Sequence, residues 1–347
     1  MTPAMTAGSP DSGKGPHDRL GRPLRDLRIS VTDRCNFRCP YCMPGEVFGR
    51  DYAFLPQSEV LTFEEIARVV RIAAGLGVTK VRLTGGEPLL RRQIERLVAM
   101  IAEVDGIEIA LTTNGAALAQ KARALHEAGL GRITVSLDSL NEDVFQAMNG
   151  VGFPLERVLE GIGAAAAAGF NPIKLNVVVK RGLNDGGLLD LARFGRENGH
   201  IVRYIEFMDV GTTNGWRLDD VVSAADILEV VDAAFPLEPL DAHYPGEVAR
   251  RYRYRDGGGE IGLIASVSQP FCRACTRARL TADGNLFTCL FATTGHDLRT
   301  LLRASDSDDS VSAVLARVWR ERSDRYSEER SSRTSSGRRI EMSYVGG

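Results

Sequence analysis

Short runs of apolar, β-branched residues alternate with helical patterns over the first part of the chain. Six of these runs are typical of strands, and they lie at residues 27–30, 81–85, 107–114, 132–138, 173–179 and 202–209. Between them, apolar residues recur at helical spacing, most clearly over residues 62–75, 93–104, 116–128 and 155–169. Repeated strand–helix–strand units predict an α/β fold with a parallel sheet covered by helices. Six strands predict an open, incomplete (βα)6 barrel of the TIM type.

One face of this predicted sheet is polar, whereas a parallel sheet buried on both faces normally consists of Val, Ile and Leu. Because side chains alternate along a strand, this face carries Lys80, Arg82 and Thr84 on one strand, Thr134, Ser136 and Asp138 on another, and Lys174 and Asn176 on a third. Buried cations without partners are costly, so cations on successive strands predict a polyanionic ligand. The alternative is a structural network in which each cation pairs with a carboxylate such as that of Glu206 or Asp138.

The cysteines form two groups of three. The first triplet is Cys35, Cys39 and Cys42, directly after the first predicted strand, and the second triplet is Cys272, Cys275 and Cys289. A structural zinc site normally has four protein ligands, whereas a [4Fe–4S] cluster held by three thiolates keeps one iron free for a small molecule. The two triplets therefore predict two [4Fe–4S] clusters, each with an open iron.

The second triplet also fits a zinc site. His296 lies seven residues after Cys289 and could complete a Cys3His ligand set. Arg277 and Arg279 favour the cluster, because a nucleotide bound at an open iron needs cations beside the ligand loop. The GGEP sequence at 85–88 closes the second predicted strand with a turn that lets backbone polar groups approach a ligand.

The CxxxCxxC motif within RDLRISVTDRCNFRCPYCMP, together with VRLTGGEPLLRR, resembles the radical S-adenosylmethionine superfamily. The C-x2-C-x13-C spacing of the second triplet and the Gly-Gly end narrow this resemblance to the GTP 3′,8-cyclase family of molybdenum cofactor biosynthesis. The resemblance runs from about residue 23 to residue 347 through LTTNG, VSLDS, RYIEFMDVG, FCRACTRARL and CLFAT. We therefore expect a radical S-adenosylmethionine barrel at 22–209 and a C-terminal capping region at 210–347 that carries the second cluster.

The resemblance also implies roles for individual residues. It assigns the S-adenosylmethionine site to Tyr41, Gly86, Ser136 and Met208. It assigns the GTP site to Arg28, Lys80, Arg82, Thr113, Lys174, Arg203, Arg277, Ala278 and Arg279. It further implies that the C-terminal tail enters the barrel, where Gly346 and Gly347 help to arrange Arg28, Arg277 and Arg279 as catalytic residues.

The implied activity starts when an external electron reduces the first cluster, which cleaves S-adenosylmethionine to methionine and a 5′-deoxyadenosyl radical. That radical takes hydrogen from C3′ of GTP, and the C3′ radical attacks C8 of guanine, giving 3′,8-cyclo-7,8-dihydro-GTP after reduction and protonation. The implied partners are a reducing electron-transfer protein and cyclic pyranopterin monophosphate synthase, for an enzyme that is a monomer or homodimer. Two alternatives stay open: a radical enzyme that modifies peptides with an auxiliary cluster, and a zinc-binding interaction module.

Composition limits the partners. A net charge of −2 and a pI near 6.3 give no overall attraction to nucleic acid or anionic membrane, and we expect neither as a partner. No stretch approaches the roughly 20 apolar residues of a membrane helix. Residues 1–21 are polar and rich in Gly, Pro and Ser, which predicts a disordered tail rather than a signal peptide and a cytoplasmic protein. The segment that contains RRYRYR at 250–255 predicts a hairpin with its turn at 256–259, in which RRYRYR is a solvated strand face. Residues 311–326 predict a helix.

Overall fold

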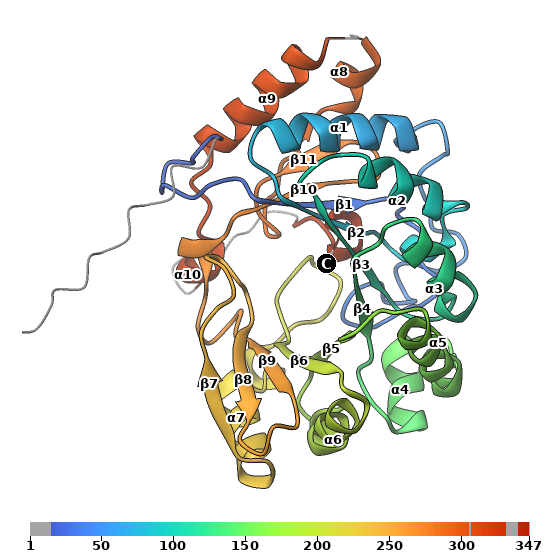
Figure 1. Ribbon diagram of the computed structural model, residues 1–347, viewed down its shortest axis with the longest axis vertical. Helices are drawn as coiled ribbons and strands as arrows, with labels where there is room; N and C mark the ends of the chain where they lie inside the picture. Colours follow the sequence, from blue (N-terminus) through green and yellow to red (C-terminus); the bar gives the residue numbers. More distant parts are fainter. Residues whose placement is uncertain (1–14, 305–306, 331–338, 347) are drawn as a thin grey trace, which may run out of the picture.

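The structure, a computed structural model, describes residues 15–304, 307–330 and 339–346 of the 347-residue chain. In these ranges the strands form one sheet in the order β12-β11-β10-β1-β2-β3-β4-β5-β6-β9-β8-β7. Because β12 and β7 are the two ends of this order, the sheet stays open. Figure 1 shows it curving around a central lumen, with helices on the outside. The predicted open barrel is therefore confirmed.

The six predicted strands form the parallel centre of the sheet. They are β1 (Asp26–Ser30), β2 (Lys80–Thr84), β3 (Glu108–Thr113), β4 (Arg132–Ser136), β5 (Lys174–Val179) and β6 (Ile201–Glu206). Each pairs in parallel with the next in chain order. Their carboxyl ends therefore meet at one end of the barrel, where the loops that follow the strands converge.

Helices cover the outer face of these strands. They are α1 (Phe63–Gly75), α2 (Ile94–Ala102), α3 (Leu118–Glu127), α4 (Glu142–Asn149), α5 (Leu155–Ala167), α6 (Leu188–Asn198) and α7 (Ala224–Ala234). The expected helices over 62–75, 93–104, 116–128 and 155–169 correspond to α1, α2, α3 and α5, with ends shifted by at most two residues. Thr62 caps the N-terminus of α1: its hydroxyl accepts a hydrogen bond from Glu65 N at 3.1 Å, and Glu65 Oε2 accepts one from Thr62 N at 2.7 Å.

The C-terminal part of the chain extends the same sheet at both edges. Its strands are β7 (Leu237–Leu240), β8 (Arg250–Tyr254), β9 (Glu260–Ile264), β10 (Arg277–Leu280), β11 (Asn285–Phe287) and β12 (His296–Asp297). Strand β10 pairs in parallel with β1, and β9 pairs in parallel with β6. The second triplet thus comes to lie beside the barrel strands, and the boundary near residue 209 divides the sequence without dividing the sheet.

The remaining helices follow β12. They are α8 (Arg299–Ala304), α9 (Asp308–Glu321), α10 (Tyr326–Glu329) and α11 (Met342–Val345). Helix α9 corresponds to the helix expected over 311–326 but ends five residues earlier. Figure 1 shows α8 and α9 beside α1, whereas α11 lies inside the lumen near the labelled C-terminus. None of the helices in the described ranges is long and apolar enough to cross a membrane.

Part of the N-terminal tail differs from the prediction of a disordered segment. Residues 1–14 of the expected disordered tail lie outside the described ranges, but residues 15–21 take defined positions. Asp18 is 6% exposed and accepts hydrogen bonds from Leu20 N and Arg22 N, both at 2.9 Å. A short polar segment can be ordered when buried charges partner its side chains, and composition alone does not show this.

The hairpin expected around 256–259 is confirmed as the antiparallel pair β8 and β9. Arginines of RRYRYR pair with carboxylates on the neighbouring strands: Arg251 with Glu260 on β9, and Arg253 with Glu238 on β7. The charges of Arg251 and Arg253 are therefore balanced by carboxylates within the sheet.

Candidate active site

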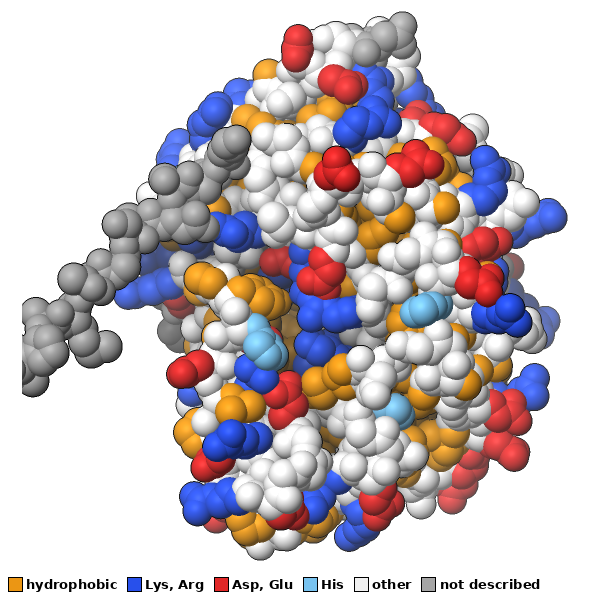
Figure 2. Space-filling model, in the orientation of Figure 1, with side chains coloured by type: hydrophobic (Ala, Val, Ile, Leu, Met, Phe, Trp, Pro, Cys, Tyr) orange, Lys and Arg blue, Asp and Glu red, His pale blue; other side chains and the backbone are white. Residues whose placement is uncertain are grey.

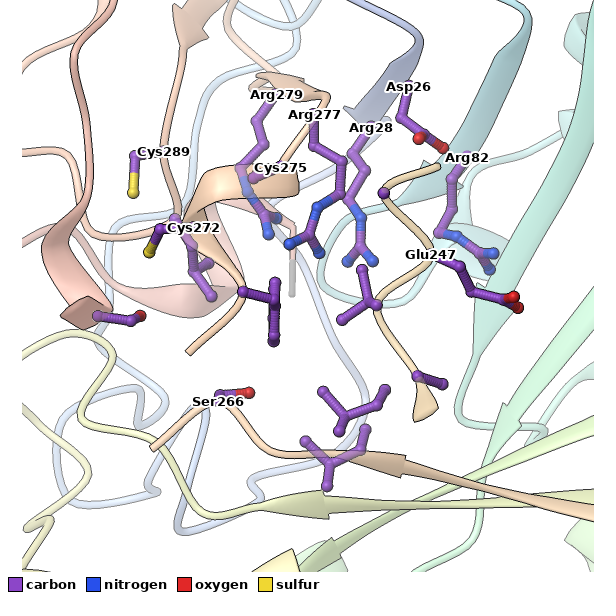
Figure 3. A pocket seen from close by; sticks show the side chains of 18 of the residues that line it. Asp26, Arg28, Arg82, Glu247, Ser266, Cys272, Cys275, Arg277, Arg279 and Cys289 are labelled. Carbon is purple, nitrogen blue, oxygen red and sulfur yellow. The ribbon is translucent and has the colours of Figure 1, made fainter. Parts of the chain in front are cut away.

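Strand register brings the predicted cations together across the lumen. Arg28 on β1 is the Cα partner of Arg279 on β10 and of Arg82 on β2, so three guanidinium groups lie in one row. Asp26, one layer earlier, is likewise aligned with Arg277 and Lys80. Figure 3 shows the head groups of Arg28, Arg277 and Arg279 pointing into the same cavity, with Arg82 nearby. Figure 2 shows Lys and Arg side chains in the hollow at the centre of the molecule.

Lys174 on β5 and Arg203 on β6 line the same cavity, so the cations come from five strands. The hydrogen bonds of Arg82 and Arg203 are made to uncharged hydroxyl groups. Arg82 Nη1 donates to the hydroxyls of Thr112 at 3.0 Å and Thr134 at 3.2 Å. Arg203 Nη2 donates to Thr134 Oγ1 at 3.3 Å, while Arg203 Nε is buried without a hydrogen-bond partner in the part of the chain that the structure describes. Asn176 Oδ1, in the same cavity, is equally unpartnered among the described residues.

Electrostatics in this cavity favour an anion. Burial, reinforced by neighbouring cations, lowers the pKa of Lys80 and of Lys174 to about 8 each. Burial, and to a smaller extent the positive charge of Arg279, holds the pKa of Arg28 well below its ordinary value. Within the described ranges, no carboxylate lies within 4.0 Å of the charged nitrogens of these lumen cations. An anionic ligand would relieve the mutual repulsion.

The alternative of a structural ion-pair network is wrong for the two carboxylates that we considered. Glu206 accepts hydrogen bonds from the backbone N–H groups of Ala224 and Val267, each at 2.7 Å. Asp138 accepts from Tyr41 OH at 2.7 Å and from Val178 N at 2.9 Å. Both carboxylates are therefore committed to other donors, and the lumen cations stay available.

The first triplet lies in a second cavity at the carboxyl ends of the strands. Cys35, Cys39 and Cys42 line it together. Burial raises the pKa of the Cys35 thiol to about 11 and that of Cys42 to about 12, and it holds the pKa of Cys39 well above its ordinary value. Charged thiolates are costly here unless a metal neutralises them, so the three side chains fit the support of a metal cluster.

The two glycines of GGEP are needed because the cysteine loop packs against them. A Cβ on Gly86 would lie 2.2 Å from Arg34 O and 3.0 Å from Cys35 N. Gly85 has φ of +142°, and a Cβ there would lie 2.5 Å from Thr32 O. The glycines of this turn thus allow a close approach of the cysteine loop, and the approach of a ligand to the same turn stays a prediction.

Glu87 of the same motif is 1% exposed and faces the first-triplet cavity. Its carboxylate accepts hydrogen bonds from Thr113 Oγ1 and Asn114 N, both at 2.7 Å. Burial outweighs these bonds and raises the pKa of Glu87 to about 7. A buried carboxylate at this place offers an acceptor to a cationic group of a bound molecule.

The second triplet lies in the same cavity as the lumen cations. Figure 3 shows Cys272, Cys275 and Cys289 at one end of this cavity, beside Arg277 and Arg279. Burial alone would raise the pKa of the Cys275 thiol, but Arg277 and then Arg322 lower it to about 6. A thiolate at Cys275 is therefore favoured at neutral pH, as a metal ligand requires.

His296 does not join the second triplet. It lies exposed on β12, where it is the Cα partner of Leu286, and it is not among the residues that line the cavity. Among the described residues, no group of three or more His, Cys, Asp or Glu side chains is arranged to hold a single metal ion. The Cys3His zinc arrangement is therefore not formed.

The C-terminal tail enters the barrel at the level of the arginines. Arg279 Nη1 donates to Gly346 O and, at 3.3 Å, to Val345 O. Ser30 Oγ donates to Tyr344 O at 3.2 Å, and Tyr344 OH donates to Asp283 Oδ2 at 2.6 Å. Gly347, for which the family resemblance also implies a catalytic role, lies outside the described residues.

Most of the expected site residues come together. Tyr41, Gly86, Ser136 and Met208 all line the first-triplet cavity. Met208 lies two residues beyond the end of β6 and lines both cavities, as do Asn176, Thr112, Ile205 and Met342. The two cavities therefore share a wall, so a molecule in one lies next to a molecule in the other.

Two expected GTP contacts differ in position. Thr113 lines the first-triplet cavity and donates to Glu87, whereas its neighbour Thr112 faces the cations. Ala278 is 1% exposed and lies between Arg277 and Arg279, so the alternation of β10 turns its side chain away from the lumen. Sequence reasoning had no signal for Tyr244, whose hydroxyl lies 3.3 Å from Lys80 Nζ, or for Met342 in the tail.

Comparison with known proteins agrees with this geometry. The model of the Radical SAM superfamily matches residues 29–195, and the model named Molybdenum Cofactor Synthesis C matches residues 200–328. Among solved structures, Streptococcus suis SuiB bound to S-adenosylmethionine has a TM-score of 0.62 at 17% identity, covering 84% of this chain and 65% of that one. The structure of SuiB bound to the precursor peptide SuiA gives a TM-score of 0.61 at 18% identity, covering 86% of this chain and 65% of that one. The barrel and its first triplet are those of the radical S-adenosylmethionine enzymes.

Curated relatives narrow the family. A GTP 3′,8-cyclase of Acidothermus cellulolyticus is 54% identical over 95% of this chain and 98% of its own length. A GTP 3′,8-cyclase of Staphylococcus haemolyticus is 47% identical with the same coverage. The chain belongs to the GTP 3′,8-cyclase family.

Proposed function

We propose that the chain converts GTP and S-adenosylmethionine to 3′,8-cyclo-7,8-dihydro-GTP, 5′-deoxyadenosine and methionine, the first step of molybdenum cofactor biosynthesis. The observation that carries this proposal is a lumen that joins two cysteine triplets. Between the triplets it carries cations that have no carboxylate partner among the described residues. GTP supplies both the triphosphate for these cations and the base for the second triplet. The names of the relatives support this assignment.

The two triplets fit two [4Fe–4S] clusters. The first triplet would hold one of them, and the cluster bound there supplies the one-electron cleavage of S-adenosylmethionine. Tyr41, Gly86, Ser136 and Met208 line the adjoining cavity and would hold S-adenosylmethionine. The buried carboxylate of Glu87 would accept hydrogen bonds from its ammonium group. The second triplet would hold the other cluster beside GTP.

The lumen cations would bind GTP. Lys80, Arg82, Lys174 and Arg203 line the part of the cavity formed by β2, β5 and β6, which suits the triphosphate. Arg28, Arg277 and Arg279 lie nearer the second triplet and suit the ribose and the first phosphate. The unpartnered Asn176 Oδ1, in the wall between the two cavities, would accept a hydrogen bond from a ribose hydroxyl. This arrangement places the sugar between the two cofactor sites.

The tail would complete the catalytic site. Gly346 brings backbone rather than a side chain to the wall beside Ser30 and Thr84, and its carbonyl oxygen holds the Arg279 guanidinium in place. A packed tail excludes water from the lumen, which protects a reactive intermediate from side reactions. Gly346, Arg28, Arg277 and Arg279 are therefore our candidates for the residues that act in cyclisation, together with Gly347.

A low-potential electron-transfer protein would reduce the first cluster, and cyclic pyranopterin monophosphate synthase would consume the product. We place the enzyme in the cytoplasm, where GTP and such reductants are available, as a monomer or homodimer. The sheet topology shared with a peptide-bound radical enzyme raises the alternative of a peptide substrate. The lumen cations favour the nucleotide, since none of them has a carboxylate partner in the part of the chain that the structure describes.

The test is anaerobic incubation of the reconstituted protein with GTP, S-adenosylmethionine and dithionite, followed by mass spectrometry of the products. We expect 3′,8-cyclo-7,8-dihydro-GTP and 5′-deoxyadenosine in equal amounts, and only uncoupled 5′-deoxyadenosine when ATP replaces GTP. Formation of 5′-deoxyadenosine without any cyclised nucleotide from GTP would contradict the proposed function.

A further inference from the structure

The ordered segment at residues 15–22 packs against the second triplet through buried charges. The Asp18 side chain is fully buried, and those of Arg22 and Arg322 are 2% and 1% exposed. Asp18 Oδ2 lies 2.6 Å from Arg22 Nε and 3.4 Å from Arg322 Nη1. One carboxylate therefore joins two guanidinium groups from opposite ends of the chain.

The other sides of both guanidinium groups reach the backbone of the second triplet. Arg22 Nη1 donates to Cys272 O at 2.6 Å and to Asp324 O at 2.9 Å. Arg322 Nη1 donates to Cys275 O at 2.7 Å. Two of the three cysteines are thus held, through their own carbonyl oxygens, by one buried ion network.

The third cysteine is connected to the same network through its neighbour. Thr288 donates from Oγ1 to Asp324 Oδ2 at 2.6 Å, and Arg322 Nε lies 3.4 Å from that same oxygen. Trp319 Nε1 donates to Arg22 O at 2.9 Å, and its ring packs under the Arg322 guanidinium with 4.5 Å from Cζ to the ring centroid. Both guanidinium groups are therefore held from several sides, while Arg22 Nη2 and Arg322 Nε are buried without a hydrogen-bond partner among the described residues.

We infer that Asp18, Arg22 and Arg322 are positioning residues that hold the second triplet in the geometry required to retain its metal cluster. This inference rests on the proposed function, because it takes the second triplet to be a cluster site. The first triplet shows the same use of arginine: Arg38 Nη1 donates to Cys35 O at 2.8 Å, and Arg38 Nε donates to Phe48 O at 2.6 Å. Each cysteine loop is thus held by guanidinium groups that bind its carbonyl oxygens.

Physical chemistry explains why ions are used at this place. A loop with three metal ligands has little regular structure, so its carbonyl oxygens need donors from outside the loop. A guanidinium group has five donors in a fixed plane and can bind several carbonyl oxygens at once. Removal of Asp18 would leave two buried guanidinium groups without their shared counter-ion, which is strongly destabilising.

The experiment isolates the second cluster. In full-length protein whose first triplet is changed to alanine, all remaining iron reports on the second site. We expect this parent to hold about four irons, and the added Asp18→Asn change to speed iron loss to an excess of chelator by tenfold or more. The electron paramagnetic resonance signal of the reduced cluster should also change. Asp256→Asn is the matched control, since it removes an exposed ion pair of the same 2.6 Å length, with Arg196.

A second variant separates cluster positioning from general stability. Arg22→Lys keeps the charge beside Asp18 but loses the fork that binds Cys272 O and Asp324 O, so iron loss should again accelerate while the thermal midpoint of the metal-free protein changes little. The inference would be overturned if both Asp18→Asn and Arg22→Lys lose iron at the parent's rate, or if faster loss only follows a lower midpoint. A parent that binds no iron would refute the second cluster itself, and with it this part of the proposed function.

Discussion

The Gly346→Ala variant tests whether the tail needs a residue without a side chain inside the barrel. Gly346 has φ of +71°, and a Cβ built on it would lie 2.2 Å from Thr84 Oγ1 and 2.8 Å from Ser30 Oγ. Contacts this short require the Thr84 and Ser30 hydroxyl groups to rotate away or the tail to shift, and the left-handed φ, which disfavours any side chain, favours a movement of the tail backbone. Because Arg279 donates to Gly346 O, such a movement also releases the guanidinium group.

The structure sets the size of the effect. An alanine in the left-handed region costs about 1–2 kcal/mol, and losing a hydrogen bond to a charged group costs about 1.5–3 kcal/mol. Together they amount to about 3 kcal/mol or more, which lowers the population of the docked tail roughly 100-fold. Cyclisation of GTP should fall by about this factor. The iron content should change little. GTP affinity should fall much less than the rate of cyclisation, because Lys80, Arg82, Lys174 and Arg203 on other strands would hold most of the triphosphate.

The assay is the anaerobic rate of formation of 3′,8-cyclo-7,8-dihydro-GTP, with iron content and GTP affinity measured on the same preparation. Gly257→Ala is the matched control, because Gly257 has φ of +82° but no atom within 4 Å of the added Cβ. It should lose stability without losing cyclisation. A Gly346→Ala enzyme that cyclises GTP at the unmodified rate would refute the claim that the tail must dock tightly.

Four further predictions follow from the same site. Reconstituted protein should hold about eight irons, and changing either triplet to alanine should remove about half of them. Only the loss of the first triplet should abolish cleavage of S-adenosylmethionine. An unchanged iron content after the loss of the second triplet would exclude a cluster there. Arg82→Ala or Lys174→Ala should weaken GTP binding by about 2 kcal/mol, roughly 30-fold by calorimetry, with Arg253→Ala as an unaffected control, and ATP should bind less tightly than GTP. Deleting the last two residues should leave both clusters but abolish most cyclisation, and a peptide ending in EMSYVGG should restore part of it; full activity of the truncated enzyme would contradict a role for the tail. Burial lowers the pKa of Lys80 and of Lys174 to about 8, and a bound triphosphate would raise both pKa values. GTP affinity should therefore be full below pH 8 and fall as the pH rises above it. A pH-independent affinity up to pH 9 would show that these lysines do not bind the phosphates.

Sequence patterns were sufficient for the barrel because its determinants are local. Each of the six strands carries its own β-branched run, and the alternation that places Lys80 and Arg82 on one face is visible within five residues. The cysteine spacings are equally local. Strand register then follows from the parallel order, and it brings Arg28 between Arg82 and Arg279 without any further signal in the chain.

The contacts that could not be predicted from the sequence join residues that lie far apart in the chain. Nothing near Asp18 indicates that Arg322, more than 300 residues later, completes its ion network, since a short polar segment has the same composition whether it is ordered or not. Which of Thr112 and Thr113 faces the cations was also beyond prediction from the sequence. Strand alternation decides between the two identical side chains, and it could be applied only once the end of β3 was known. The tail combines both cases: the Gly-Gly end is visible in the sequence, but its contact with Arg279 depends on β10 pairing beside β1. A contact between two distant segments exists only after the fold has placed both of them. Variants at Asp18 and Gly346 therefore test contacts that the fold, and no local sequence pattern, creates.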